Sequence, residues 1–168
     1  MKQLVSLTMA ALLLGVFMPE AGVVAQTAND QFRGTSWTLV SGRIERGGRE
    51  VRFAAPRLQG FLVFDSNDHF LMALMRSGAS KPTSNSSNAG TVEQNKAPLQ
   101  RSIACFGTYS INDADHGISA HIEGSSFSKW IGTDQKRFFI MTGDKLKWTN
   151  SPPSGGKGTA ESVWKRVR

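Results

Sequence analysis

The chain of 168 residues has one cysteine and only three histidines, and each scarcity excludes a class of chemistry. A single cysteine, Cys105, cannot form a disulfide within the chain, so no internal cross-link holds this fold together. Cys105 lies in the apolar stretch "SIACFGTY", which indicates a buried core position rather than a nucleophile. His69, His116 and His121 lack the spacing of metal ligands, so we expect no metal site.

Motifs for cofactor chemistry are absent as well. The sequence has no nucleophile elbow, no phosphate-binding loop and no dinucleotide fingerprint. We therefore expect no cofactor, and any catalysis would have to come from a simple acid–base pair.

Long apolar runs are missing except at the start of the chain, where Leu4 to Met18 form one. A basic residue precedes this run, and Val23 and Ala25 occupy the minus-three and minus-one positions of a cleavage site. The run is shorter than the roughly 20 residues that a membrane-spanning helix needs. These features predict a signal peptide over residues 1–25 and a mature protein that is periplasmic or secreted.

Acidic residues are fewer than basic ones, and the net charge is +7. The basic residues are spread along the chain rather than gathered in one stripe, so we expect no nucleic-acid binding. A basic protein is still attracted to anionic lipid or polysaccharide. A weak contact with an anionic envelope surface is therefore one alternative for the function.

The apolar pattern after the leader has a period of two, and no helix of ten or more residues is indicated. Polar turn clusters separate the apolar runs, which predicts a series of hairpins and about eight strands. Such a pattern favours an all-β, antiparallel meander that closes into a barrel or sandwich. The predicted turns lie at Asp65–Asp68, Asn112–Gly117 and Thr142–Asp144, and "SWTLVSGRIER" and "TAESVWKRVR" form the first and last strands.

One segment interrupts this pattern. Residues 77–98 are rich in Ser, Asn, Gly and Pro, which predicts a long flexible loop. Residues 91–100 have room for one short helix, and residues 150–158 predict a second loop. After the leader, the chain divides into a flexible N-terminus at 26–33 and a single domain at 34–168.

Several of these stretches resemble the bacterial lipocalin-like domain family, whose members are small proteins of mostly undefined role. The resemblance extends from Gly34 to Arg166 and includes "GTSWTLVSG", "GFLVFDSNDHFLMALMR", "FGTYSIND", "HIEGS", "WIGTDQKRFF", "DKLKW" and "VWKR". Its strongest motif combines Trp130, Gly132, Gln135 and Arg137 with His121 upstream. The resemblance implies an eight-stranded antiparallel up-and-down barrel with one open mouth, and it implies no established reaction.

An eight-stranded barrel has an interior just wide enough for packed side chains or for one small ligand. Phe70 and Met72 belong to an apolar strand that contributes either to a pocket or to a packed core. Trp37 and Arg166 become neighbours if the last strand returns to the first. We expect the guanidinium to lie over the indole and seal the closed end, a structural contact of about 0.5–2 kcal/mol.

The hairpin from Ile118 to Ile140 carries the candidate site. With a turn centred near Lys129, His121 lies opposite Arg137 and Glu123 lies opposite Gln135, on one face. Ordinary patterning places this polar face in solvent and the apolar face inside. The alternative places it in the lumen, where Arg137 binds an anionic head group and His121 makes a hydrogen bond.

We predict an exported, monomeric lipocalin-like protein that binds a small apolar or amphipathic molecule, including anionic ones, in its barrel without catalysis. Its alternatives are the envelope contact above and a barrel enzyme of the isomerase or cyclase type that uses His121 and Arg137. The predicted ligand-binding residues are His121, Arg137, Gln135, Trp130, Met72 and Phe70.

Overall fold

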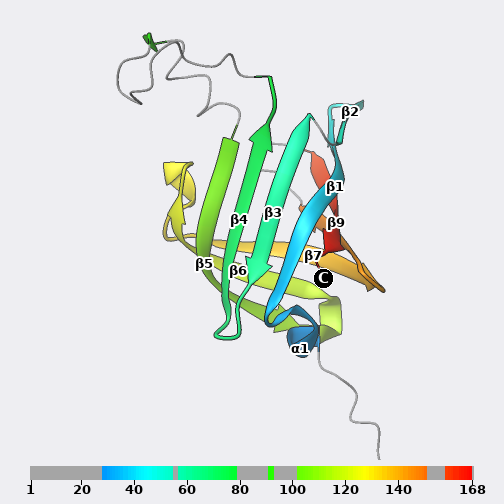
Figure 1. Cartoon of the computed structure of the whole chain (residues 1–168), viewed down its shortest axis with the longest axis vertical. Coiled ribbons are helices and arrows are strands. Elements are labelled where there is room, and N and C mark those ends of the chain that lie inside the picture. Colours follow the sequence, from blue (N-terminus) through cyan, green and yellow to red (C-terminus); the bar gives the residue numbers. More distant parts are fainter. Residues whose placement is uncertain (1–27, 55–56, 79–90, 93–101, 151–157, 168) are drawn as a thin grey trace, which may run out of the picture.

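The computed structural model describes residues 28–54, 57–78, 91–92, 102–150 and 158–167. The predicted signal peptide, most of the loop at 77–98 and most of the loop at 150–158 lie outside these residues. The elements are α1 (Ala28–Phe32), β1 (Thr35–Arg46), β2 (Arg49–Ala54), β3 (Leu58–Phe64), β4 (His69–Arg76), β5 (Ser102–Asn112), η1 (Asp113–Asp115), β6 (Gly117–Ser125), η2 (Ser128–Trp130), β7 (Asp134–Thr142), β8 (Lys145–Asn150) and β9 (Thr159–Arg166) (Figure 1).

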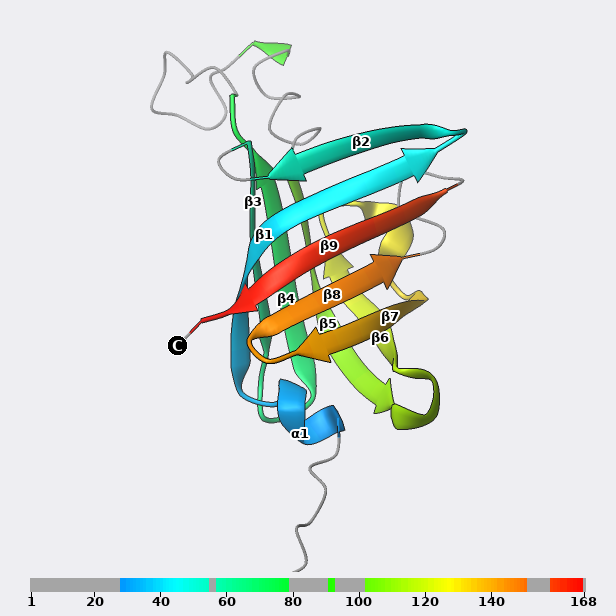
Figure 2. The same cartoon turned by 90° about the vertical axis from the view of Figure 1, so that its right-hand side faces the viewer.

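Eight antiparallel strands, β1 and β3 to β9, form a closed barrel. Each pairs with its neighbour in the sheet, and β1 closes the ring by pairing with β9 (Figure 2). The predicted all-β class and the three predicted hairpins are confirmed. No helix in the described part of the chain is long and apolar enough to cross a membrane.

The strand β2 was not predicted from the sequence. The strand β1 has twelve residues, long enough to pair with two strands along the same edge. Thr35–Thr38 pair with β3, and Ser41–Arg46 pair with β2. Gly47 and Gly48 between β1 and β2 have φ values of 57° and 75°. Two consecutive residues with positive φ are the signature of a tight two-residue hairpin, so this glycine pair was the signal for β2.

The helix α1 lies at the end of the barrel where β3–β4, β5–β6 and β7–β8 make their turns (Figure 2). Phe32 is fully buried there, with its ring 4.9 Å from those of both Phe64 and Phe139. The prediction of a flexible segment at 26–33 is therefore wrong for Ala28–Phe32, because burying the Phe32 ring fixes the helix against the barrel.

The predicted contact between the first and last strands is present at this closed end. Trp37 pairs with Arg166, and the Arg166 guanidinium lies 4.5 Å from the centre of the Trp37 indole. Arg166 also donates a hydrogen bond of 3.0 Å to the carbonyl of Gln31. One side chain thus ties β9 to both β1 and α1.

Candidate functional site

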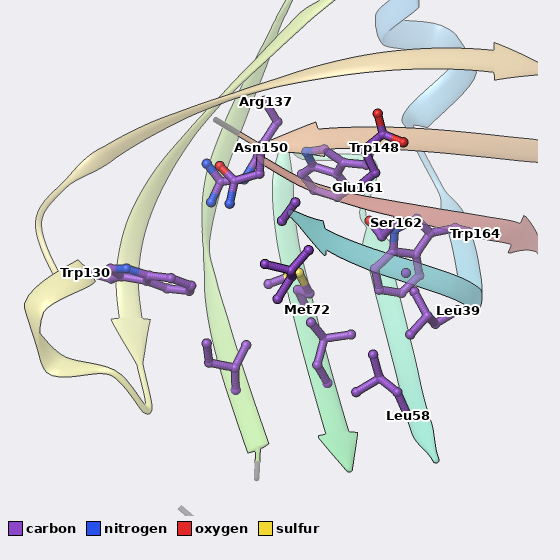
Figure 3. A pocket seen from close by; sticks show the side chains of 15 residues that line it. Leu39, Leu58, Met72, Trp130, Arg137, Trp148, Asn150, Glu161, Ser162 and Trp164 are labelled. Atoms are coloured by element: carbon purple, nitrogen blue, oxygen red, sulfur yellow. Dashed lines mark hydrogen bonds between the residues drawn. The ribbon is translucent and has the colours of Figure 1, made fainter. Parts of the chain in front are cut away.

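A cavity of about 160 Å³ occupies the opposite, open half of the barrel (Figure 3). The end of β8, the start of β9, η2 and the second half of β1 meet there. Its walls are mostly aliphatic and aromatic, so an apolar molecule is desolvated on entry. The apolar residues that line it are Leu39, Ile44, Leu58, Met72, Leu74, Ile103, Trp130, Trp148, Ala160 and Trp164.

Small inward-facing residues leave this space open. Gly42, Ala160 and Ser162 line the cavity on β1 and β9. On β3, Gly60 makes room for neighbours: a Cβ there would lie 2.6 Å from Leu74 and 3.1 Å from Trp164. Because the width of the barrel is set by its strand number, small residues at inward positions become free volume.

A β-bulge in β1 decides which of its residues face this cavity. The pairing of β1 with β9 shifts between Leu39 and Ser41, so the alternation of faces changes phase there. Gly42 and Ile44 consequently line the cavity. Without the bulge, strict alternation from Trp37 and Leu39 would bring Arg43 into the lumen.

The observed pairing of β6 with β7 differs from the predicted register. His121 pairs with Asp134, and Ile118 pairs with Arg137. The connection is asymmetric, because Ser126 N–H donates to Ala104 of β5 and η2 adds a turn before β7 begins. The slip is an odd number of residues, so it reverses how the faces of the two strands align.

This register separates the four polar residues that the sequence placed on one face. Gln135 and Arg137 are half-buried on the inward side of β7, whereas His121 and Glu123 are exposed on the outside of β6. His121 Nδ1 lies 2.7 Å from Asp134 Oδ1, and its side chain is 49% exposed. The placement in solvent holds for His121 and Glu123 but not for Arg137. The alternative that puts His121 in the lumen beside Arg137, and with it the predicted ligand contact of His121, is wrong, and the two residues do not form an acid–base pair in one cavity.

Arg137 brings a positive charge to the cavity wall. Its guanidinium donates hydrogen bonds to the Gln135 side-chain oxygen and, at 3.1 Å, to the Lys136 carbonyl. Burial lowers the pKa of Arg137 to about 10, so the group remains a cation at neutral pH. Among the described residues, no carboxylate forms an ion pair with it.

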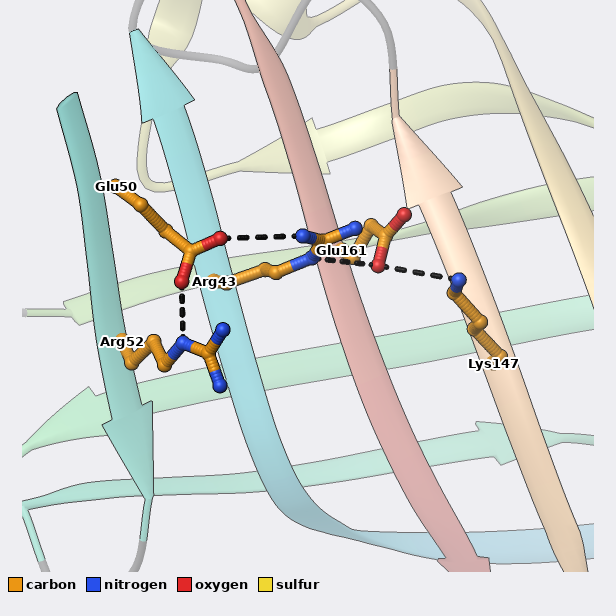
Figure 4. A network of polar contacts seen from close by, with 5 residues as sticks. All are labelled: Arg43, Glu50, Arg52, Lys147 and Glu161. Atoms are coloured by element: carbon orange, nitrogen blue, oxygen red, sulfur yellow. Dashed lines mark hydrogen bonds and ion pairs between the residues drawn. The ribbon is translucent and has the colours of Figure 1, made fainter. Parts of the chain in front are cut away.

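The carboxylate of Glu161 belongs to a different network, although Glu161 borders the cavity. It accepts a hydrogen bond of 2.7 Å from Arg43 and lies 3.2 Å from Lys147 Nζ (Figure 4). Arg43 also pairs with Glu50, which in turn pairs with Arg52. These charges link β2, β1, β9 and β8 on the side of the sheet away from the cavity.

Trp148 forms part of the cavity wall next to the packed half of the barrel. Its ring stacks on that of Phe64, with centroids 6.1 Å apart, and it also lines the cavity. Phe64 and Tyr109 meet edge to face, 4.9 Å apart, on the packed side. The indole of Trp148 therefore separates the aromatic core from the cavity.

Cys105 is buried in the barrel interior, as the sequence predicts. Burial raises the pKa of its thiol to about 11, so the nucleophilic thiolate form is scarce at neutral pH. Across the described residues, no group of three His, Cys, Asp or Glu side chains is placed to hold a metal ion.

The other predicted site residues divide between the two halves of the barrel. Met72 and Trp130 line the cavity. Gln135 does not line it, but its side-chain oxygen accepts a hydrogen bond from Arg137, which does. Phe70 is buried opposite Phe64 in the packed half and does not line this cavity, so its predicted ligand contact is not supported. The cavity residues that sequence reasoning missed include Leu58, Ile103, Trp148, Asn150 and Trp164, although "DKLKW" and "VWKR" carry the two tryptophans at inward positions.

In a comparison with known families, residues 34–167 match a family model described as a lipocalin-like domain. A comparison with curated proteins found no match. The matched region begins one residue before β1 and ends one residue after β9, so it contains the whole barrel.

Proposed function

The chain belongs to the lipocalin-like domain family, and from this membership and the cavity we propose that it is an exported protein that binds a small apolar or amphipathic molecule in its barrel. The role is that of a binding protein rather than an enzyme. The protein acts as a monomer in the periplasm or outside the cell, after removal of residues 1–25.

The apolar cavity is the observation that carries this proposal. A cavity of about 150 Å³ lined by aliphatic and aromatic side chains stays dry and takes up benzene in another protein. The cavity described here has a similar volume, about 160 Å³, and similar walls. It therefore suits a molecule the size of one ring or a short branched chain, and a longer molecule would have to extend through the mouth.

Native mass spectrometry of the protein, purified gently from a host that exports it, tests the proposal. We expect a bound small molecule at one copy per chain, and a polypeptide mass that begins at Gln26. A mass that retains the leader would contradict the export proposal. An empty protein that also takes up no molecule from a panel of small hydrophobic probes would contradict ligand binding.

A matched pair of variants connects any uptake to the cavity. Ala160→Leu places a larger side chain in the cavity and should abolish uptake. Ala73→Leu adds the same atoms on β4, on the face away from the cavity, and should leave uptake unchanged. Equal uptake by both variants would place the bound molecule elsewhere.

The outer face of β3 to β5 favours a second candidate function. Three adjacent strands expose large apolar side chains there, with Phe61 43%, Leu71 47% and Phe106 52% exposed. An apolar patch on a protein of net charge +7 suits weak contact with an anionic envelope surface. Retention on anionic vesicles that falls with added salt and with Leu71→Ser would support this function, and no retention at low salt would contradict it.

A further inference from the structure

Three polar side chains meet at one wall of the cavity. The ladder between β7 and β8 pairs Phe138 with Thr149, so the next residues, Arg137 and Asn150, face each other across it. Trp148 lies two residues before Asn150 and thus on the same face of β8. All three line the cavity, and Figure 3 shows Arg137 and Asn150 on the side of Trp148 that carries its indole nitrogen.

The Trp148 indole N–H is a buried donor that finds no acceptor among the described residues. Two other tryptophans of the barrel have theirs satisfied: Trp37 donates to Thr35 and Trp164 donates to Ser162, each at 2.8 Å. Buried donors in native proteins almost always have a partner, and leaving one unmade is unfavourable. An acceptor atom on a bound molecule would satisfy this donor.

Arg137 has hydrogen-bond acceptors, but among the described residues it has no anionic partner to balance its charge. Its acceptors, the Gln135 side chain and the Lys136 carbonyl, are both neutral oxygens. The carboxylate of Glu161, which borders the cavity, is paired with Arg43 and Lys147. A partly buried cation with only neutral acceptors is stabilised when an anion arrives, and guanidinium and carboxylate make strong charge-assisted pairs.

Facing these groups, the wall of the cavity is hydrocarbon. Leu58, Met72, Leu74 and Ile103 come from β3, β4 and β5, across the barrel from β8. A molecule that fits both the wall of Arg137 and Trp148 and the apolar wall opposite has one acid group and a compact apolar body. The volume of about 160 Å³ limits that body to about one ring.

We propose that the cavity selects a small carboxylic acid with a single aromatic ring or a short branched chain. The carboxylate accepts hydrogen bonds from the Arg137 guanidinium and the Trp148 indole N–H, and the ring lies against Met72 and Ile103. The inference rests on the proposed function, because it requires that the cavity binds a ligand.

Three probes of similar size test the proposal by titration calorimetry on the mature protein. Phenylacetate carries the ring and the charge, phenylacetamide carries the ring without the charge, and toluene carries the ring alone. We expect phenylacetate to bind at least tenfold more tightly than phenylacetamide. Equal affinity for the acid and the amide, or tighter binding of toluene, would overturn the proposed selectivity while leaving the cavity as a binding site. Failure of all three probes to bind would contradict the proposed function itself.

Two variants then assign the selectivity to the two donors. Arg137→Met should remove the preference for acid over amide. Trp148→Phe keeps an aromatic ring at the position but lacks the N–H, and it should weaken phenylacetate several-fold without changing toluene. Trp37→Phe is the control, because Trp37 lies in the closed half away from the cavity and its N–H already has its acceptor in Thr35, so it should leave the ratio of acid to toluene affinity unchanged. A Trp148→Phe variant with unchanged acid affinity would remove Trp148 from the site.

Discussion

The two halves of this barrel share the same alternation of inward and outward residues, but the interior of one is packed and the interior of the other contains a cavity. In the closed half, inward aromatic rings from α1, β3, β5 and β7 meet edge to face, and Phe32 fills the centre. In the open half, small residues such as Gly42 and Ala160 share the inward positions with aliphatic side chains, and a cavity results.

The strand β4 shows this transition within a few residues. Phe70 is buried at the closed end, whereas Met72 and Leu74, on the same face toward the open end, are only half-buried. All three side chains are apolar and face inward, so the difference lies in what stands opposite them. The comparison indicates that the closed half supplies most of the stability and the open half is free to bind a ligand.

Removing the ring at the centre of the closed half should have the largest effect. Phe32→Ala should lower the free energy of unfolding by about 3–5 kcal/mol, since it empties a fully buried site between Phe64 and Phe139. Phe61→Ala, on the outer face of β3, should lower it by less than about 1 kcal/mol. Urea unfolding followed by tryptophan fluorescence measures both, and similar losses would mean that α1 does not close the barrel.

The same small-to-large change in each half tests the contrast in packing. Ala120 is buried with 5% exposure, so Ala120→Leu should overpack the interior and lower the free energy of unfolding by about 1–3 kcal/mol. Ala160→Leu places the same atoms in the cavity and should cost less than about 1 kcal/mol. If Ala160→Leu proved as damaging as Ala120→Leu, the open half would be as tightly packed as the closed half.

The contact between Arg166 and Trp37 seals the closed end and should contribute a smaller amount. Arg166→Met keeps much of the apolar stem and removes the cation, which should lower the free energy of unfolding by about 0.5–2 kcal/mol. Lys145→Met, an exposed lysine of β8, should change it by less than about 0.5 kcal/mol. Thermal unfolding of the two variants makes the comparison, and equal midpoints would show that the cation has no sealing role.

The charge network outside the open half should give the smallest effect, and one that depends on pH. Arg43 and Lys147 hold the pKa of the Glu161 carboxyl below its ordinary value of 4.5. A carboxyl with a lowered pKa stabilises the fold above the unfolded pKa, and the contribution is lost as pH falls through the folded pKa. Glu161→Gln should therefore destabilise the protein by about 1 kcal/mol or less at pH 7.

The difference in stability between the wild type and Glu161→Gln should vanish as the pH falls below the ordinary carboxyl pKa. Thermal unfolding at several pH values measures it. Glu123→Gln, on the exposed outer face of β6, provides the control and should show a small gap at every pH. A Glu161→Gln gap that widened in acid would show that the network does not stabilise the fold through the ionised carboxylate.

Most of the strands could be predicted because their signals are local. In β3 and β4, apolar residues flank a polar cluster at Asp65–Asp68, and the turn forms from those residues alone. The hairpins of β5–β6 and β7–β8 follow the same rule. The helix α1 could not be predicted in this way, because its five residues are held by the burial of Phe32 in a core that other strands supply.

The candidate site was predicted only in part, and the hairpin from β6 to β7 shows why. Its residues suggest a turn centred near Lys129, but Ser126 continues to pair with β5, and this shifts the register of β7. The sequence singled out Arg137, which does line the cavity, but it kept His121 on the same face as Arg137, and the observed register separates the two. Trp148 and Trp164, which line the cavity, are inward residues with ordinary strand patterning, so nothing local distinguishes them from core residues.

The sequence by itself determined the all-β class, the turns and the family, because alternation and turn chemistry act between residues close in the chain. The tertiary structure alone decided which polar residues face the lumen and where the cavity lies. The reason is physical: a face depends on register, which hydrogen bonds to a distant strand can shift. A cavity is the volume left when the inward side chains of eight strands are taken together, and no single segment contains that information.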